Sequence, residues 1–349
     1  EISECLVGSE MCIRDRDYTG GGDYNPKDAT LRFNSRGGTE FDDIVRDDPF
    51  EYNPYNKIPS RPGYRFTGWY NNSSLDRRYP EDEKISVPKG ITTVWAGWEE
   101  TSVPSMLNGD DHYAYVIGFT DGSVRPYANI TRAQVATIFF RLLTDDTREE
   151  YWSQVNDYTD CSSDLWCNNA ISTLSNMGII DGFSDGTFRP YAKITRAQFA
   201  KIAVGFFETT REDYQGYFTD VDIDAWYTEY VEAAARVGLI EGFNDGTFRP
   251  NTNITRAQAC VIVNRALGRA PDEDRLLDED EMITWPDNNP DDWFYADMQE
   301  ATNSHDYTWV TVSGDKVEKW TEKLEQRDWA ALEHAWSTAH SAPGGEVTE

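Results

Sequence analysis

Positive charge is scarce in this 349-residue chain: 32 lysine and arginine residues stand against 62 aspartate and glutamate residues, for a formal net charge of -30. Proteins that hold nucleic acids need a basic surface to neutralise phosphates, so the composition argues against that class. No apolar run approaches the roughly 18 residues of a membrane span, and no signal peptide is recognisable. Because the chain begins at Glu1 rather than methionine, we expect a fragment that lacks its export signal.

Cysteine and histidine are also few. The five cysteines are odd in number and unevenly placed, which does not make a disulfide framework. Cys161 and Cys167 could pair, but small buried thiols are the favoured interpretation. No histidine has zinc-ligand spacing, so we expect surface side chains and no metal or cofactor site. The histidines are His112, His305, His334 and His340.

Sequence signatures of catalysis are missing as well. The chain has no nucleophile elbow, no phosphate-binding loop and no cysteine–histidine pairing. The acidic residues are so numerous that a pair of carboxylates gives no specific support for a glycosidase. Asp121, Asp185 and Asp245 stand in Asp-Gly pairs, which indicate turns, and the further oxygen ligands of a calcium loop are missing. The sequence therefore predicts a protein that is not an enzyme.

The chain does contain an internal repeat. The pentapeptide Ile-Thr-Arg-Ala-Gln occurs at 130–134, 194–198 and 254–258, each time after a Gly-Phe-x-Asp-Gly-x-x-Arg-Pro approach. Equivalent residues at nearly constant spacing indicate a repeat array. The threonine and glutamine of each copy have the spacing of a capping box, followed by an apolar stripe of helical period. The predicted N-caps are Thr131, Thr195 and Thr255.

An arginine occupies the first helical position in each copy, at Arg132, Arg196 and Arg256. A cation is unfavourable there because a helix N-terminus carries partial positive charge. An unfavourable placement of charge that recurs at three equivalent positions indicates that the arginine has a function there. One interpretation is an anion site, since the planar guanidinium fork suits a carboxylate. The other is an intramolecular salt bridge. In the first case we expect the three side chains to reach outward.

The N-terminal part of the chain differs from the array. Residues 1–27 are expected to be a disordered or non-native leader, and residues 28–100 alternate as strands do, with glycine and proline turns. The stretches 33–39, 61–70 and 94–98 resemble a Listeria–Bacteroides repeat of the internalin B type. That resemblance implies a small β-grasp-like α+β module that serves as a spacer or adhesive unit. Its aromatic side chains are expected to form the core.

The array follows a linker at 101–110. Its expected motifs are 111–157, truncated at the front, then 158–216 and 217–278, with a partial fourth unit at 279–305. In the later units an aspartate stands six residues before a tryptophan, at Trp166, Trp226 and Trp293. We expect the helix near Trp293 to pack onto the first unit and close the ring. Residues 306–349 are expected to be a helical tail, with one or two helices over 317–336 and a disordered end.

The repeat resembles the S-layer homology domain over about residues 111–305. That resemblance implies an all-α, three-motif pseudo-threefold spindle that holds exported proteins on the cell wall. The implied ligand is an anionic, pyruvylated secondary cell-wall polysaccharide. The implied ligand-binding residues are Arg132, Arg196 and Arg256; the N-cap threonines and Trp166, Trp226 and Trp293 are weaker candidates. This chain has glutamine where the family usually has glutamate, and the truncated first motif puts the neighbouring groove in doubt.

These observations predict a non-enzymatic fragment of an extracellular cell-wall or S-layer protein, with no nucleic-acid or membrane partner. Two alternatives stay open. The chain could be the anchoring remnant of a larger surface enzyme, or a self-assembly module that binds no glycan and uses its arginines in internal salt bridges. The sugar, the occupied grooves and the oligomeric state do not follow from the sequence.

Overall fold

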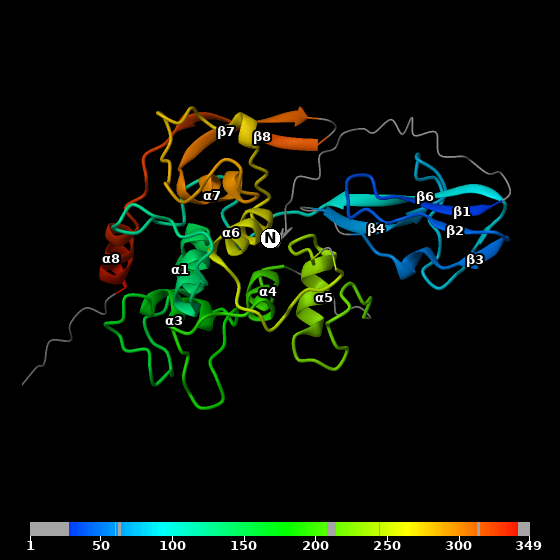
Figure 1. Ribbon diagram of the computed structural model, residues 1–349. Coiled ribbons are helices and arrows are strands. Elements are labelled where there is room, and N and C mark those ends of the chain that lie inside the picture. The colour runs from blue at the N-terminus through cyan, green and yellow to red at the C-terminus, as the bar shows by residue number, and fades with distance from the viewer. Residues whose placement is uncertain are drawn as a thin grey trace, which may run out of the picture. The chain divides into compact units, whose positions relative to one another are not determined.

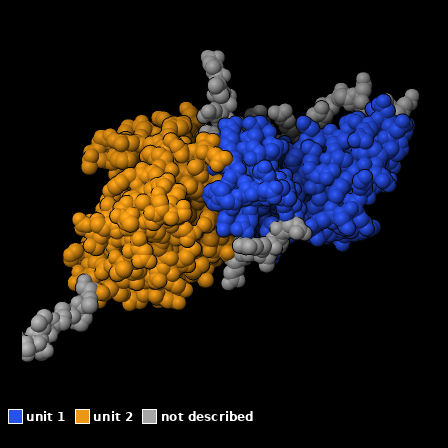
Figure 2. Space-filling model, turned by 90° about the horizontal axis from the view of Figure 1, so that it is seen from below, with its two compact units in different colours: residues 1–102, 209–250 blue, residues 103–208, 251–349 orange. Residues whose placement is uncertain are grey.

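The computed structural model describes residues 28–59, 61, 64–207, 214–243, 245–312 and 315–340. The expected leader at 1–27 and the expected disordered end at 341–349 lie outside these residues. The chain divides into two compact units (Figure 2). Unit 1 contains residues 1–102 and 209–250, and unit 2 contains residues 103–208 and 251–349. The end of the second predicted motif and the first half of the third therefore cluster with the N-terminal module.

The N-terminal module of unit 1 is built on a four-stranded sheet of order β2-β1-β6-β4 (Figure 1). Strands β1 and β6 are parallel, and the two outer pairs are antiparallel. A separate antiparallel ribbon pairs β3 with β5. The elements are β1 (Ala29–Asn34), β2 (Ile44–Arg46), β3 (Phe50–Tyr52), η1 (Pro54–Asn56), β4 (Tyr64–Tyr70), β5 (Ile85–Val87) and β6 (Gly90–Glu100). Within the described part of 28–102, the only helical segment is the 3-10 turn η1.

Aromatic side chains fill the core of this module, as the sequence predicts. Trp69 is fully buried, and its ring meets those of Phe33 and Phe66 edge-on at centroid distances of 5.3 and 5.5 Å. The indole Nε1 donates to the carbonyl of Lys57 at 2.8 Å, so its polar end is satisfied. Gly68 stands at a bulge with φ of 131°, a conformation that favours glycine. The sheet is therefore closed on one side by a packed aromatic core.

The array portion of unit 1 contains α5 (Thr228–Arg236). Its buried Glu232 accepts hydrogen bonds from the backbone N–H groups of Gln215, Gly216 and Tyr217. Gly238 follows the C-cap of this helix and has φ of 73°, the left-handed conformation in which helices commonly end. An added Cβ at that position would lie 2.7 Å from the carbonyl oxygen of Arg61, so only glycine fits without a shift.

Unit 2 is mainly helical. Helix α3 packs against α1, and both α4 and α7 pack against α6. The helices are α1 (Arg132–Leu142), α2 (Asp145–Tyr151), α3 (Asn168–Asn176), α4 (Arg196–Val204), α6 (Arg256–Ala266), α7 (Tyr295–Thr302) and α8 (Trp329–Ala339), with a 3-10 turn η2 (Glu273–Arg275). The broad prediction of a sheet-containing N-terminal region before a helical region is confirmed. No helix among the described residues is long and apolar enough to cross a membrane.

Three equivalent isoleucines tie the repeated segments of unit 2 together. The N–H of Ile194 donates to the carbonyl of Ile130 at 3.2 Å, Ile254 donates to Ile194 at 3.0 Å, and Ile130 donates to Ile254 at 3.2 Å. The three hydrogen bonds form a closed cycle, and all three side chains are buried. Each repeat therefore satisfies the backbone of the next, which explains why the pentapeptide has to recur as a set.

The segment at 279–305 supplies what the front of the first motif lacks. The Asp287 carboxylate accepts from the N–H groups of Val124 and Arg125 at 2.9 and 2.7 Å. In the second motif Asp160 holds Phe188 and Arg189 in the same way, at 2.7 and 2.8 Å. The carbonyl of Ala301 in α7 accepts from the N–H groups of Tyr115 and Val116 at 3.1 and 3.0 Å. Residues 279–305 thus contact the first motif, at 111–157, as the displaced aspartate–tryptophan spacing predicts.

We expect the Asp287→Ala variant to lose about 1–3 kcal/mol of unfolding free energy, because the N–H of the buried Val124 would be left without an acceptor. Urea denaturation of the full chain measures the change. The matched control is Asp291→Ala, which removes an exposed carboxylate from the same loop. Equal midpoints for the two variants would contradict a closing role for Asp287.

The prediction of a helical tail over 306–349 is wrong for its first half. Strands β7 (His305–Val312) and β8 (Asp315–Lys323) form an antiparallel hairpin, and only α8 is helical (Figure 1). Residues 307–312 are all aromatic or β-branched, which favours a strand. Trp320 is buried against Met282 and Tyr295, so the hairpin covers one face of α7. The correction concerns the tail, because the described residues of 111–304 form helices and no strand.

Candidate functional site

The three predicted capping boxes are present. In each, the threonine hydroxyl accepts from the glutamine N–H and the glutamine side chain accepts from the threonine N–H. The first box has distances of 3.2 and 2.9 Å between Thr131 and Gln134. Thr131, Thr195 and Thr255 are half-buried, and the cap uses the acceptor capacity of each hydroxyl. These threonines place the following arginine at the first position of each helix.

The arginines themselves are buried, with exposed fractions of 8% at Arg132, 2% at Arg196 and 6% at Arg256. The outward orientation that the sequence suggested is therefore wrong. Arg132 donates from Nε to the carbonyl of Phe188 at 2.8 Å and from Nη2 to the carbonyl of Asp181 at 2.7 Å. Its guanidinium lies 4.3 Å from the centre of the Phe188 ring. The arginine side chain thus crosses from one motif to the turn of the next.

Arg256 repeats this arrangement against the first motif. Its Nε donates to the carbonyl of Val124 at 2.8 Å, and its guanidinium lies 5.1 Å from the centre of the Phe119 ring. Its Nη2 is buried without a hydrogen-bond partner among the described residues. Burial lowers the pKa of Arg132 and of Arg256, and neither side chain forms an ion pair with a carboxylate in the described part of the chain. Both are buried cations that contact carbonyl dipoles and aromatic rings directly, whereas the carboxylates of Asp160, Asp181 and Asp287 act on them from beyond ion-pair distance.

Two exposed tyrosines each precede a residue whose backbone binds the start of an arginine-bearing helix. The carbonyl of Ala128, next to Tyr127, accepts from the N–H of Arg256, and the carbonyl of Ala192, next to Tyr191, accepts from the N–H of Arg132. The two tyrosines are 63% and 64% exposed. The sequence had not singled them out. Their signal was the aromatic residue that follows Arg-Pro in the first two copies.

The predicted tryptophans are placed differently from the arginines. Trp166 and Trp226 are 54% and 55% exposed, whereas Trp293 is half-buried against the Phe294 ring at a centroid distance of 5.2 Å. A single exposed indole is normal on a protein surface and does not by itself identify a ligand site. The structure does not bring Trp166 or Trp293 into a described contact with an arginine of the predicted site.

A second set of arginines holds the Asp-Gly turns. Arg125, Arg189 and Arg249 have φ values of 52°, 60° and 57°, which are unfavourable for a residue with a side chain. Each guanidinium pairs with the aspartate four residues earlier and lies within 3.8–3.9 Å of the centre of a phenylalanine ring. The glycines of these turns also have positive φ, which confirms the predicted turns.

The prediction of surface histidines is wrong for His112 and His305, which are 2% and 1% exposed. Each stands in sequence far from the other, so no local spacing could reveal that they meet in the fold. His334 is exposed, as predicted. Cys161, Cys167 and Cys260 are free and buried, which confirms the prediction of small buried thiols, and Cys5 and Cys12 lie outside the described residues.

Comparison with known families agrees with the repeats. Residues 157–200 and 217–260 match the family model of the S-layer homology domain. Residues 30–96 match that of the Listeria–Bacteroides repeat domain. Apart from its last residue, the predicted first motif at 111–157 lies outside the matched ranges.

Several curated proteins are similar to the chain. It is 34% identical over 236 residues to Cell surface glycoprotein 1 of Acetivibrio thermocellus, a match that covers 64% of this chain and 10% of that protein. It is 33% identical over 229 residues to the Cellulosome-anchoring protein of the same organism, covering 64% and 49%. It is 36% identical over 118 residues to Amylopullulanase of Thermoanaerobacterium thermosulfurigenes, covering 34% and 6%. The chain thus spans half or less of each relative.

The matched families and relatives indicate an extracellular protein associated with the cell wall. The repeated pentapeptide, its capping boxes and the aspartate-held turns lie largely within the matched ranges. The chain carries S-layer homology motifs, preceded by a Listeria–Bacteroides repeat domain.

Proposed function

We propose that this chain holds a larger exported protein on the bacterial cell wall without a covalent bond, by binding an anionic, pyruvylated secondary cell-wall polysaccharide. Arg132, Arg196 and Arg256 would bind the acidic groups, and the exposed aromatic residues nearby would pack against sugar rings. The S-layer homology motifs support this proposal, as does the similarity to a protein named for anchoring the cellulosome. The N-cap threonines and Trp166, Trp226 and Trp293 remain weaker candidates.

The observation that carries the proposal is the state of Arg256. A buried guanidinium without a carboxylate partner keeps its full charge in a poorly solvated place. Its Nη2 is also a buried donor that no described acceptor satisfies. A pyruvyl carboxylate would satisfy both needs, since hydrogen bonds between a guanidinium and a carboxylate are among the stronger ones in proteins. The ligand would thus offset a cost that the fold carries.

The same proposal gives an architecture to the whole chain. Three motifs, at 111–157, 158–216 and 217–278 and closed by 279–305, would form a pseudo-threefold spindle. The closed cycle of hydrogen bonds among Ile130, Ile194 and Ile254 supports that symmetry. Residues 28–100 would be a β-grasp-like spacer or adhesive module, joined by a linker at 101–110. The sheet order, with its parallel central pair, supports this assignment.

Sedimentation with purified cell walls tests the proposal. We expect wild-type protein to bind walls that carry a pyruvylated polymer and to bind weakly after the polymer has been extracted. The Arg132→Ala/Arg256→Ala variant should bind roughly tenfold to a hundredfold more weakly per arginine, because each charge-assisted contact is worth about 1.5–3 kcal/mol. Several weak sites acting together would raise retention further.

Two controls separate binding from folding. Arg275→Ala removes the same charge from a side chain that pairs with Asp272, and it should bind walls like wild type. Arg256→Lys keeps the charge but loses the planar fork, so it should bind poorly while its circular dichroism stays that of the wild type. Equal retention of wild type and the folded double variant would overturn the proposal.

One alternative is that the chain is the anchoring part of a larger surface enzyme. It is favoured by the similarity to Amylopullulanase, which covers only 6% of that protein. The full reading frame decides between the two cases. A self-assembly module with arginines in internal salt bridges is disfavoured, because Arg132 and Arg256 donate to carbonyl groups instead.

A further inference from the structure

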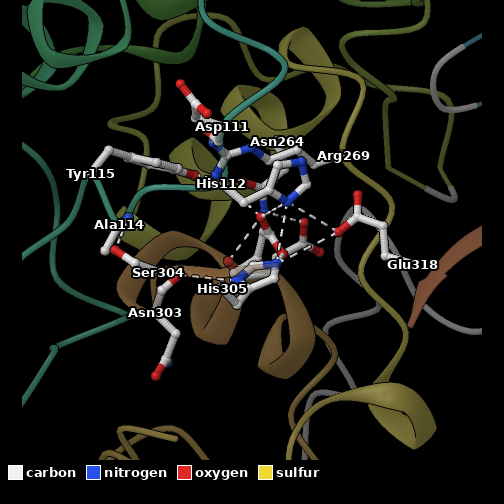
Figure 3. Close-up of polar contacts among 12 residues, drawn as sticks. Asp111, His112, Ala114, Tyr115, Asn264, Arg269, Asn303, Ser304, His305 and Glu318 are labelled. Atoms are coloured by element: carbon white, nitrogen blue, oxygen red, sulfur yellow. Dashed lines mark hydrogen bonds and ion pairs between the residues drawn. The ribbon is translucent and has the colours of Figure 1, made fainter. Parts of the chain in front are cut away.

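A cluster of two histidines and two glutamates is buried in unit 2, away from the repeated arginines. It contains His112, Glu300, His305 and Glu318, which are at most 2% exposed. His112 lies at the start of the first motif, Glu300 lies on α7, His305 begins β7, and Glu318 lies on β8. Figure 3 shows the side chains of His112, His305 and Glu318 pointing toward one another. Side chains of this kind are rarely buried together without a cation or a proton to balance them.

The distances within the cluster are those of atoms around a common centre. His112 Nδ1 lies 3.2 Å from His305 Nε2, 3.0 Å from Glu300 Oε1 and 3.4 Å from Glu318 Oε2. His305 Nε2 lies 3.2 Å from Glu300 Oε2 and 4.0 Å from Glu318 Oε2. Ligands about 2.1 Å from a tetrahedral zinc ion are separated from one another by about 3.4 Å. One ligand atom from each of the four residues lies within 4.8 Å of every other, so small side-chain shifts would bring them to that spacing.

The ligand atoms are also held in orientation by their surroundings. His305 Nδ1 lies 3.1 Å from the carbonyl of Asn303, an arrangement in which Nδ1 donates and Nε2 keeps its lone pair. The imidazole of His305 stacks on Trp320 at a centroid distance of 3.8 Å, and that of His112 stacks on Tyr307 at 4.0 Å. The N–H of Ala270 donates to Glu318 Oε1 at 2.7 Å, which leaves Oε2 for the cluster.

Two carboxylate oxygens of the cluster are left without a hydrogen bond. Glu300 Oε2 and Glu318 Oε2 are buried, and neither accepts one from a described residue. Arg269 is the neighbouring cation, and its Nη1 donates to Glu300 Oε1 at 3.2 Å. One guanidinium cannot balance two carboxylates. The negative charge that remains in the cluster favours a bound cation.

We propose that His112, Glu300, His305 and Glu318 bind one zinc-class divalent cation in a closed, four-ligand structural site. Imidazole and carboxylate together suit zinc, whereas calcium takes six or more oxygen ligands and magnesium demands an octahedral shell. The low exposure of all four residues leaves no open position for a substrate, so the site is structural. The metal fastens the start of the first motif to α7 and to the β7–β8 hairpin.

Zinc titration of the full-length chain tests this site. The protein is first treated with EDTA and dialysed, then titrated with Zn²⁺ alone in a calorimeter. We expect one equivalent to bind, and the melting temperature to rise with Zn²⁺ and fall again with EDTA. Co²⁺ in place of Zn²⁺ should give the intense visible absorption of a tetrahedral centre. Failure of the wild-type chain to bind Zn²⁺ would overturn the proposal and leave a proton-balanced charge network.

Variants show whether the bound zinc is held by these residues. Glu318→Gln keeps the side-chain volume and should weaken Zn²⁺ binding by more than about 100-fold, beyond the effect of losing an outer-shell partner. It should also abolish the Co²⁺ absorption and the response of the melting temperature to EDTA. The matched control is His334→Ala, which removes an exposed histidine and should bind one equivalent with unchanged affinity. Unchanged zinc affinity in a folded Glu318→Gln variant would place the metal elsewhere and refute the site.

Discussion

A chain that ends at residue 284 is expected to lose the cooperative unfolding of unit 2. The deletion removes Phe294 at the N-cap of α7 and Met298 and Ala301 on α7, a helix that packs against α6; all three side chains are fully buried. Loss of one large buried side chain costs about 2–5 kcal/mol. A whole domain is stable by only about 5–15 kcal/mol, so the loss of a helix face exceeds what the fold can bear. It also removes Asp287, which holds the first turn.

The matched control for this truncation is a chain that ends at residue 304. It keeps Asp287 and α7 but lacks the hairpin and α8. Thermal unfolding followed by circular dichroism should show a cooperative transition for the longer chain, lowered from that of the full-length protein, and none for the shorter one. If both chains melt at the same temperature as the full-length protein, closure by residues 279–305 does not stabilise the array.

The Trp69→Ala variant is expected to destabilise the N-terminal module by about 3–5 kcal/mol. Trp69 is fully buried, it contacts the rings of Phe33 and Phe66, and its indole hydrogen-bonds to Lys57. A small module has little stability to spare, because a short chain buries a small fraction of its surface. Amide hydrogen exchange in β1 and β6 should therefore accelerate strongly, whereas retention on cell walls should remain that of the wild type.

The control for this substitution is Val45→Ala on β2. Val45 is 57% exposed, so its truncation should leave the exchange rates unchanged. Slow exchange in the Trp69→Ala variant would mean that the aromatic core does not hold the module together. Loss of wall retention in that variant would mean that the β module takes part in anchoring, contrary to the division of roles proposed above.

The buried arginines change how anchoring would be achieved. A guanidinium in solvent would attract an acidic sugar weakly, because water and salt screen the charge. Arg132 and Arg256 are instead fixed by main-chain carbonyls of the neighbouring motif and by phenylalanine rings. A fixed donor loses little freedom when it binds, so the same side chain can hold two motifs together and favour an acidic ligand.

Local structure could be predicted from the sequence alone. The capping boxes at Thr131, Thr195 and Thr255, the positive-φ glycines of the Asp-Gly turns and the core role of Trp69 depend on residues close in the chain or on simple burial. The displaced aspartate before Trp293 also predicted which segment completes the first motif. These features could be recognised because each repeat is a copy of the others within one chain.

Only the tertiary structure decided the rest. The direction of the arginine side chains depends on carbonyl groups about 50 residues or more away, at Phe188 and Val124. The strands at 305–312 and 315–323 depend on pairing with each other and on the cover that Trp320 gives to α7. His112 and His305 meet only because the end of α7 packs against the start of the first motif. Contacts between segments far apart in the sequence produce no repeating pattern of residue types, because neither residue of such a pair restricts the residue types beside it in the chain.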